Sequence, residues 1–153
     1  MNSTRIEFVM PRGHEVSYGF DAHRLRNLRI EPTEERVAMT TQTAEYARST
    51  ITSEDYEPFV VGGEAIGEVH WIRTEGAEGA TLAVGLWRSE PQSFPYPFTA
   101  DETIHALQGE LVIDLESGEK VTLRPGDIAS FTKDTKSTWT VTQPFKKLFV
   151  ISG

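Results

Sequence analysis

The sequence predicts an all-β protein, built as a single small jelly-roll β-barrel. Two observations lead to this prediction: short apolar segments recur at fairly regular spacing from residue 56 onward, and tight-turn signals such as Ser117-Gly118 and Pro125-Gly126-Asp127 separate them. Many short strands joined by tight turns are typical of sandwiches and barrels. A third observation is size, since 153 residues with 38% hydrophobic and 25% charged content suit one globular domain.

The first 55 residues are polar and weakly patterned. Residues 4–10 fit a strand, which Pro11-Arg12-Gly13 would end. Residues 22–30 fit a short helix or a strand equally well, and residues 33–39 give a weak helical start with Thr33 as the N-cap. We therefore expect two parts: an N-terminal arm over residues 1–55, packed along the barrel or against a partner subunit, and the barrel itself over residues 56–153.

Within the barrel, the predicted strands are residues 66–73, 81–87, 104–107, 111–115, 121–123, 128–131, 137–141 and 147–151. Leu111, Ile113 and Leu115 alternate with more polar residues, which indicates a strand with one buried face. Gly118 tolerates the positive φ of a hairpin turn, and Pro125-Gly126 is typical of a second tight turn. The stretch between Trp87 and Glu102 is rich in aromatic residues and prolines and is predicted to be a loop.

Composition excludes several classes of site. The chain has no cysteine, so disulfides, cysteine-ligated zinc and thiol nucleophiles are absent. The formal net charge is −8, and no basic face of the kind that binds nucleic acid is visible. The small basic groups are interpreted as solvated surface: Arg24, Arg26, Arg29, Lys133, Lys136, Lys146 and Lys147.

The hydropathy pattern gives no reason to expect a membrane protein. No segment approaches the roughly 18 apolar residues needed to span a bilayer. The N-terminal residues also lack an uninterrupted apolar core of signal-peptide length. The expected location is therefore cytoplasmic, with no membrane partner.

The turns and one carboxylate are arranged in a recognisable rhythm. Six residues separate Glu102 from Gly109, and sixteen separate Gly109 from Gly126. This spacing resembles the cupin family, whose first motif is G-x5-H-x-H-x3-4-E-x6-G and whose second begins with a glycine. Glu102 and Gly109 match the end of the first motif, and Gly126 matches the start of the second. The resemblance covers roughly residues 62–153.

The same stretch is similar to a branch of cupins that contains (S)-ureidoglycine aminohydrolase and the Q-type ethanolamine-utilisation protein. The residues that carry this likeness are Gly85 and Trp87, Tyr96-Pro97, Asp101-Glu102, Leu107-Gln108-Gly109-Glu110, Ser117-Gly118, Pro125-Gly126-Asp127 and Trp139. The resemblance implies a jelly-roll barrel that commonly forms homodimers and acts on small molecules. An edge strand or the polar arm would supply the dimer contact.

The chain departs from the cupin pattern at the metal ligands. Three histidines and one glutamate usually hold the metal in this family. Here the two histidine positions of the first motif fall on Tyr96 and Phe98, or on Pro95 and Pro97 if the longer spacing applies. The histidine position of the second motif falls on Ser137. One carboxylate cannot hold a transition metal tightly. The expected pocket is therefore metal-free. A divalent metal remains an alternative, with Glu102, His70 and His105 as its ligands.

Glu102 is the first candidate for chemistry. If it points into the barrel, burial favours its neutral form and makes it a usable acid or base. The alternative is that it caps a turn or pairs with an arginine such as Arg88. Tyr96 offers a second polar group through its hydroxyl. His105 lies three residues from Glu102 and so points to the opposite face of a strand, unless a β-bulge turns it inward.

These residues give the predicted site. The catalytic candidates are Glu102, Tyr96 and His105, and the substrate-binding candidates are Trp71, Trp87, Phe98, Phe131, Ser137 and Trp139. Most of the aromatic residues, Phe94 included, are expected to be core. By resemblance, the expected function is a small-molecule enzyme of the lyase, isomerase or aminohydrolase type acting on a polar metabolite. A binding module without catalysis and a metal enzyme with unusual ligands remain alternatives.

Overall fold

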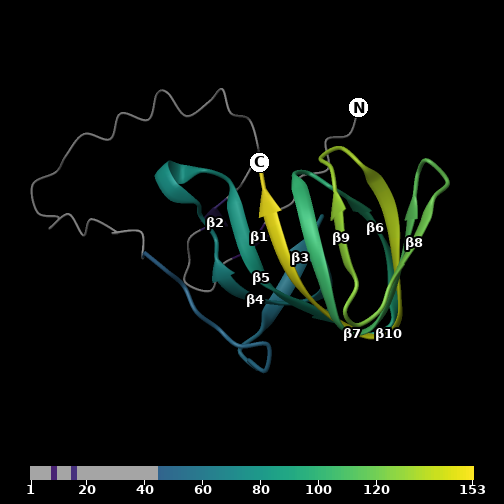
Figure 1. Ribbon diagram of the computed structural model, residues 1–153, viewed down its shortest axis with the longest axis horizontal. Coiled ribbons are helices and arrows are strands. Elements are labelled where there is room, and N and C mark those ends of the chain that lie inside the picture. The colour runs from purple at the N-terminus through teal and green to yellow at the C-terminus, as the bar shows by residue number, and fades with distance from the viewer. Residues whose placement is uncertain (1–7, 10–14, 17–44) are drawn as a thin grey trace, which may run out of the picture.

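A computed structural model describes residues 8–9, 15–16 and 45–153, and it confirms the all-β prediction (Figure 1). Strand β1 (Phe8–Val9) lies within the predicted strand over residues 4–10 and pairs antiparallel with β2 (Glu15–Val16). The segments 22–30 and 33–39 lie outside the described residues. The predicted arm is therefore described only in these short pieces and from residue 45 onward.

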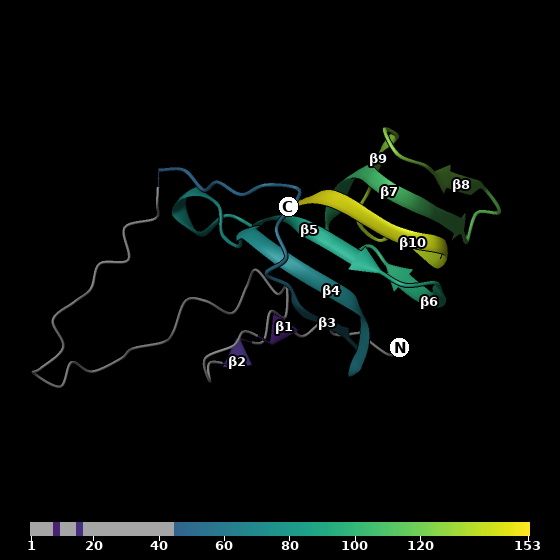
Figure 2. The same cartoon turned by 90° about the horizontal axis from the view of Figure 1, so that it is seen from below.

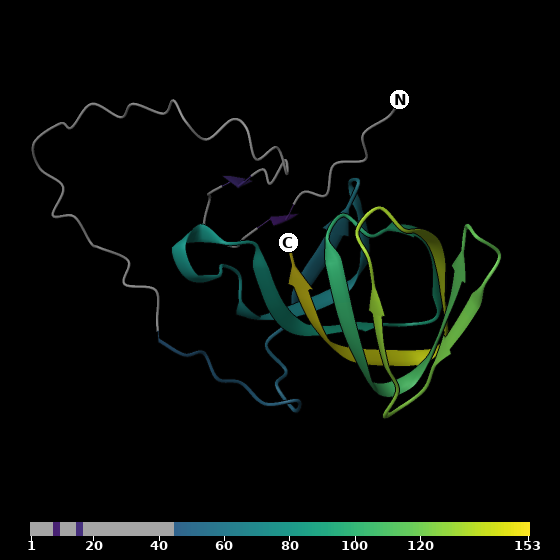
Figure 3. The ribbon, with the colours of Figure 1, turned by 45° about the horizontal axis from the view of Figure 1, so that its top comes forward.

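The main sheet contains eight antiparallel strands in the order β3-β4-β5-β10-β7-β8, with β6 also paired to β10 and β9 also paired to β7. Their bounds are β3 (Glu57–Val61), β4 (Glu64–Arg73), β5 (Leu82–Ser89), β6 (Gln92–Pro97), β7 (Asp101–Leu115), β8 (Lys120–Leu123), β9 (Ile128–Phe131) and β10 (Lys136–Ser152). A 3-10 turn, η1 (Ala77–Gly79), joins β4 to β5. Figure 2 shows β4, β5 and β10 side by side, and Figure 3 shows the strands curving around one interior.

Two pairs of predicted strands are in fact single long strands. Strand β7 runs through Gly109 instead of turning there, and β10 joins residues 137–141 to residues 147–151. Gly109 has φ +75°, and a Cβ atom at this position would lie 2.0 Å from the Pro144 carbonyl oxygen. Glycine is thus required because the bulged part of β10 passes directly over it.

The irregularity at Gly109 changes which face of β7 is buried. Before it, Ile104 and Ala106 point into the core, whereas after it Leu111 and Ile113 do so. Even-numbered residues are therefore buried first and odd-numbered residues afterwards. One extra residue in a strand reverses the side-chain alternation in this way.

Two strands of the main sheet were not predicted. Strand β6 lies in the stretch expected to be a loop, because Pro95 and Pro97 argue against a strand. It pairs with β10 alone, so its prolines lie in an edge strand, where missing N–H donors are tolerated. Strand β3, at the start of the barrel, carries too weak an alternation to be recognised.

The predicted turns are confirmed. The Gly118 N–H donates to the Leu115 carbonyl at 2.9 Å and closes the β7–β8 hairpin. In the second turn the Asp127 carboxylate accepts a 2.8 Å hydrogen bond from the Arg124 N–H. Among the described residues, no helix has the length and hydropathy needed to cross a membrane.

The barrel interior is packed with aromatic rings, as expected. Of the seven aromatic residues singled out from the sequence, six are buried and Trp71 is partly buried. Trp87 meets Trp139 edge to face with ring centroids 5.9 Å apart, and Phe98 stacks on Phe131 at 4.6 Å. Edge-to-face and offset contacts of this kind stabilise a core beyond simple area burial.

Candidate functional site

Glu102 points into the barrel from the start of β7. It is only 2% exposed, and it shares its face of the strand with Ile104 and Ala106. Its neighbours in the sheet are Phe131 on β9 and Ile151 on β10. Of the two alternatives that the sequence leaves open, the structure has the inward orientation, and the carboxylate lies among apolar side chains.

The carboxylate is paired with a buried lysine. Lys147 Nζ lies 2.6 Å from Glu102 Oε1, and the two side chains are 4% and 3% exposed. The expectation that Lys147 belongs to the solvated surface is wrong. On β10 it alternates with Phe145 and Phe149, which are both buried, so the strand places it inside. The alternation of Lys147 with two phenylalanines is the sequence signal that indicates an inward side chain. The adjacent Lys146 faces outward.

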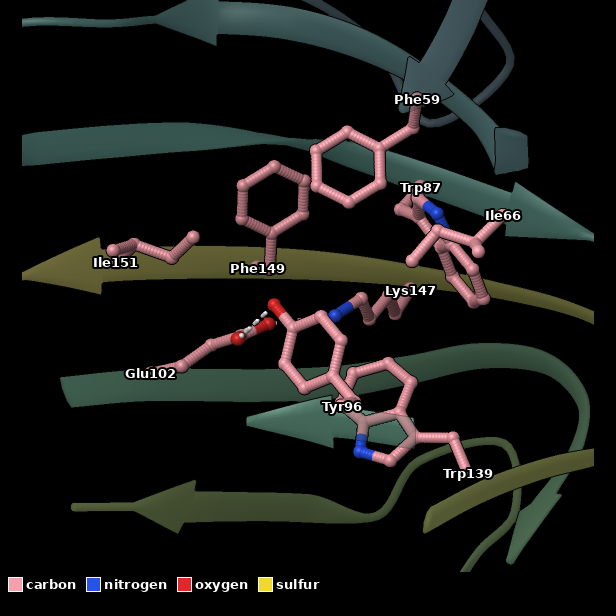
Figure 4. A pocket seen from close by; sticks show the side chains of 9 residues that line it. All are labelled: Phe59, Ile66, Trp87, Tyr96, Glu102, Trp139, Lys147, Phe149 and Ile151. Carbon is pink, nitrogen blue, oxygen red and sulfur yellow. Dashed lines mark hydrogen bonds and ion pairs between the residues drawn. The ribbon is translucent and has the colours of Figure 1, made fainter. Parts of the chain in front are cut away.

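Tyr96 completes the cluster from β6. Its hydroxyl donates a 2.8 Å hydrogen bond to Glu102 Oε2, so each carboxylate oxygen has one partner (Figure 4). The Ser137 hydroxyl holds the Tyr96 backbone by donating to its carbonyl oxygen at 2.6 Å, and Trp139 Nε1 donates to Ser137 in turn. Ser137 thus positions Tyr96.

The Lys147 ammonium group is surrounded by rings. Its nitrogen lies 4.3 Å from the ring centroid of Trp139, 5.3 Å from those of Trp87 and Phe149, and 5.8 Å from that of Tyr96. All four distances fall within the range in which the π face attracts a cation. The aromatic residues of the barrel therefore form a cage around a cation that belongs to the chain itself.

Burial changes the acid–base properties of two members of the cluster. It lowers the pKa of Lys147 below its ordinary value, although the nearby Glu102 carboxylate works in the opposite direction. Burial also raises the pKa of Tyr96 well above its ordinary value, and the negative charge of Glu102 adds to this effect. Tyr96 is therefore a hydrogen-bond donor over the whole physiological pH range.

A small cavity lies beside these three polar groups. It has a volume of about 10 Å³, measured as room for the centre of a water molecule. That is about the space one water molecule requires. The residues that line it are Phe59, Ile66, Trp87, Tyr96, Glu102, Trp139, Lys147, Phe149 and Ile151 (Figure 4). Of these, Ile151 alone is partly exposed.

The two histidine candidates do not join the cluster. His105 lies on the outward face of β7, and no bulge turns it inward. His70 lies on β4, where its Nε2 is 2.6 Å from the Ser49 hydroxyl oxygen and its Nδ1 is 2.7 Å from the Asp55 carbonyl oxygen. These contacts attach residues 49–55 to the outside of the sheet.

The remaining predicted residues divide by position. Trp87 and Trp139 line the cavity, whereas Trp71, Phe98 and Phe131 pack behind it as core. Arg88, considered as a partner for Glu102, instead binds Glu54 and Glu68 at 2.9 and 2.8 Å on the surface.

The cluster does not fit a divalent metal ion. Within residues 45–153, no group of three or more histidine, aspartate or glutamate side chains is close enough to share one. The one inward carboxylate already binds an ammonium group, which has no lone pair to donate and repels a second cation. Glu102, His70 and His105 therefore do not form the alternative metal site considered from the sequence.

Comparison with known proteins supports the fold. The family model of the EutQ-like cupin domain matches residues 76–149 of this chain. Among solved structures, the ethanolamine utilization protein Q described as putative from Salmonella typhimurium LT2 is 22% identical, with a TM-score of 0.50, over 56% of this chain and 68% of that one. EutQ from Clostridium difficile is 20% identical, with a TM-score of 0.49, over 55% of this chain and 65% of that one.

At these identities the likeness to solved structures concerns the fold alone. No protein of curated function matches the chain. The family match covers β5 to most of β10, which are the strands that carry Tyr96, Glu102 and Lys147. The chain therefore has a cupin fold, and its residues 76–149 are similar to the EutQ-like cupin domain.

Proposed function

We propose that the barrel is the active site of a small-molecule enzyme in which Glu102 transfers a proton. The observation that carries this proposal is the buried carboxylate held between Lys147 Nζ at 2.6 Å and the Tyr96 hydroxyl at 2.8 Å. A buried ion pair is a poor way to stabilise a fold, because apolar residues of similar volume often do as well or better. Its presence beside a cavity therefore supports a chemical role.

The three groups suit proton abstraction beside a carbonyl or carboxylate. Glu102 is the base that takes the proton from carbon. Lys147 and Tyr96 supply a positive charge and a hydroxyl donor that stabilise the negative charge left on the substrate oxygen. Many lyases and isomerases that act on small polar metabolites use such a step. No metal is needed, because the ammonium group supplies the positive charge.

The experiment is exchange of carbon-bound hydrogen with solvent. The protein is incubated in D₂O with pyruvate, 2-oxobutyrate or glycolaldehyde, and loss of the carbon-bound proton signal is followed by NMR. Glu102→Gln should reduce the exchange rate by about 10²–10⁴-fold, the usual contribution of a positioned acid or base. Glu110→Gln is the matched control, since Glu110 lies on the same strand but pairs with Arg124 at the surface.

A binding module is the second candidate, in which Glu102 orients a ligand instead of transferring a proton. All three polar groups satisfy one another, and the remaining space holds about one water molecule. A binder would show ligand-dependent thermal stabilisation with no exchange in either the wild type or Glu102→Gln. An enzyme would instead lose exchange in the variant while ligand affinity stays within a few-fold.

A further inference from the structure

The lysine of the cluster has a second capability that proton transfer alone does not use. Lys147 is the only one of the five lysines in the sequence that is buried. Its nitrogen lies beside the cavity and within hydrogen-bonding distance of a carboxylate that can accept its proton. Enclosed lysines of this kind are the ones that proteins use to form covalent adducts with carbonyl compounds.

We propose that Lys147 is a nucleophile that condenses with the carbonyl group of a small aldehyde or 2-oxo acid. The product is a protonated imine held inside the barrel. This inference rests on the proposed function, because it names the substrate class of the same site. It also gives the aromatic cage a role, since the rings that surround the ammonium would equally surround the positively charged imine.

The groups present account for every proton in the reaction. The Lys147 ammonium first gives a proton to Glu102, and the free amine attacks the carbonyl carbon. A nitrogen–carbon bond forms, the carbonyl π electrons move to oxygen, and a proton passes from nitrogen to that oxygen. Glu102 then returns its proton to the hydroxyl group, which leaves as water as the C=N bond forms. The ammonium and the carbonyl compound thus become a protonated imine and one water molecule.

Two features of the site favour this reaction. Burial lowers the pKa of Lys147, so a larger fraction of free amine is available near neutral pH than for a solvated lysine. The Tyr96 hydroxyl is held beside Glu102 and remains protonated, so it can donate a hydrogen bond to the carbonyl oxygen as negative charge develops there.

Entry requires one local movement. The cavity holds about one water molecule, so a carbonyl compound needs more room than the described conformation leaves. Ile151 is the partly exposed member of the lining and faces Glu102 across the β7–β10 pairing. Figure 4 shows Ile151 on the same side of the cavity as Glu102, so the movement that this inference requires is a change of the Ile151 side-chain rotamer. Rotamer changes at such positions are fast compared with chemistry.

The test is reductive trapping on the full-length wild-type protein. Pyruvate, 2-oxobutyrate or glycolaldehyde is supplied below one equivalent with cyanoborohydride near neutral pH, and peptide mass spectrometry locates the adduct. Lys146 is an internal control, because it is adjacent in β10 but faces outward and donates to the Ile51 carbonyl. We expect the adduct to form on Lys147 in preference to Lys146, because Lys147 lies beside the cavity and burial lowers its pKa.

Ile151→Ala provides a second measurement that does not remove any polar group. It should increase the rate of trapping at Lys147 and leave that at Lys146 unchanged. Labelling confined to the four outer lysines in both proteins would overturn the proposal.

The same compounds separate this inference from the proposed function. Solvent exchange without an adduct at Lys147 would refute the imine and leave proton transfer by Glu102 standing. An adduct without exchange would support the imine and refute proton transfer. Absence of both would refute both.

Discussion

Lys147→Met should destabilise the protein far more than loss of any surface lysine. The substitution keeps the length of an unbranched side chain but leaves Glu102 as a buried charge whose remaining partner is the Tyr96 hydroxyl. Removing one member of a buried ion pair costs about 3–5 kcal/mol. For a domain of this size, each kcal/mol lowers Tm by about 2–4 °C, so the expected decrease is about 6–20 °C.

The structure supplies a matched surface pair. Lys120 and Asp114 lie 3.3 Å apart with side chains 65% and 47% exposed, whereas Lys147 and Glu102 lie 2.6 Å apart at 4% and 3%. An exposed pair contributes about 0–1 kcal/mol, so Lys120→Met should have little effect. Adding Glu102→Gln to Lys147→Met removes the unpaired charge and should recover most of the lost stability.

The assay is urea unfolding followed by tryptophan fluorescence, because two of the three tryptophans are buried near the pair. The midpoint and slope for the wild type, the two single variants and the double variant give the free energies of unfolding. The reasoning fails if Lys147→Met costs no more than Lys120→Met. It also fails if the double variant is less stable than Lys147→Met alone.

Two further predictions follow from the backbone and the pKa shifts. Because the pKa of folded Tyr96 lies well above that of the unfolded chain, the folded state holds one more proton above about pH 10, and stability decreases there by up to about 1.36 kcal/mol per pH unit. Tyr96→Phe should remove this loss in unfolding measured at increasing pH, and Tyr46→Phe, at an exposed position, should not. Gly109→Ala should lower the free energy of unfolding by much more than the roughly 1–2 kcal/mol that a left-handed alanine costs, because its methyl group would collide with a carbonyl oxygen. Gly118→Ala has open space around the new methyl group and should cost only that amount. Equal urea midpoints for the two variants would contradict this prediction.

Below pH 10 the sign of the Lys147 contribution is the opposite of that of Tyr96. Its folded pKa is lowered, so the unfolded chain holds more protons between that value and about 10.4, and stability increases with pH in this window. Lys147→Met should abolish the increase. The free energies of unfolding of the wild type and of Lys147→Met are compared from pH 8 to 10. If the two curves stay parallel, burial does not lower the pKa of Lys147.

Several parts of the site were predictable because they depend on local alternation. The odd separation of Glu102 and His105 along a strand predicts that they lie on opposite faces, and they do. The prediction that Lys147 is solvated is wrong, although the residue obeys the same rule. Its position between Phe145 and Phe149 indicates an inward side chain, whereas the general tendency of lysines in short basic groups to be solvated predicts the wrong face.

Other parts depend on contacts between segments distant in sequence. Strand β6 exists because β10 pairs with it and leaves its prolines at an edge, a fact that the proline-rich sequence does not contain. Gly109 was expected to end a strand. Instead it allows β7 to continue beneath Pro144, and the need for glycine comes from that close approach.

The sequence by itself determined the fold class, most of the strands and both tight turns. Each of these follows from a pattern within a few residues, since alternation and turn chemistry are local. Only the tertiary structure decided that Lys147 and Tyr96 are the partners of Glu102. The three residues lie on three different strands, and the distances between their polar atoms are set by sheet pairing and by the aromatic packing around them.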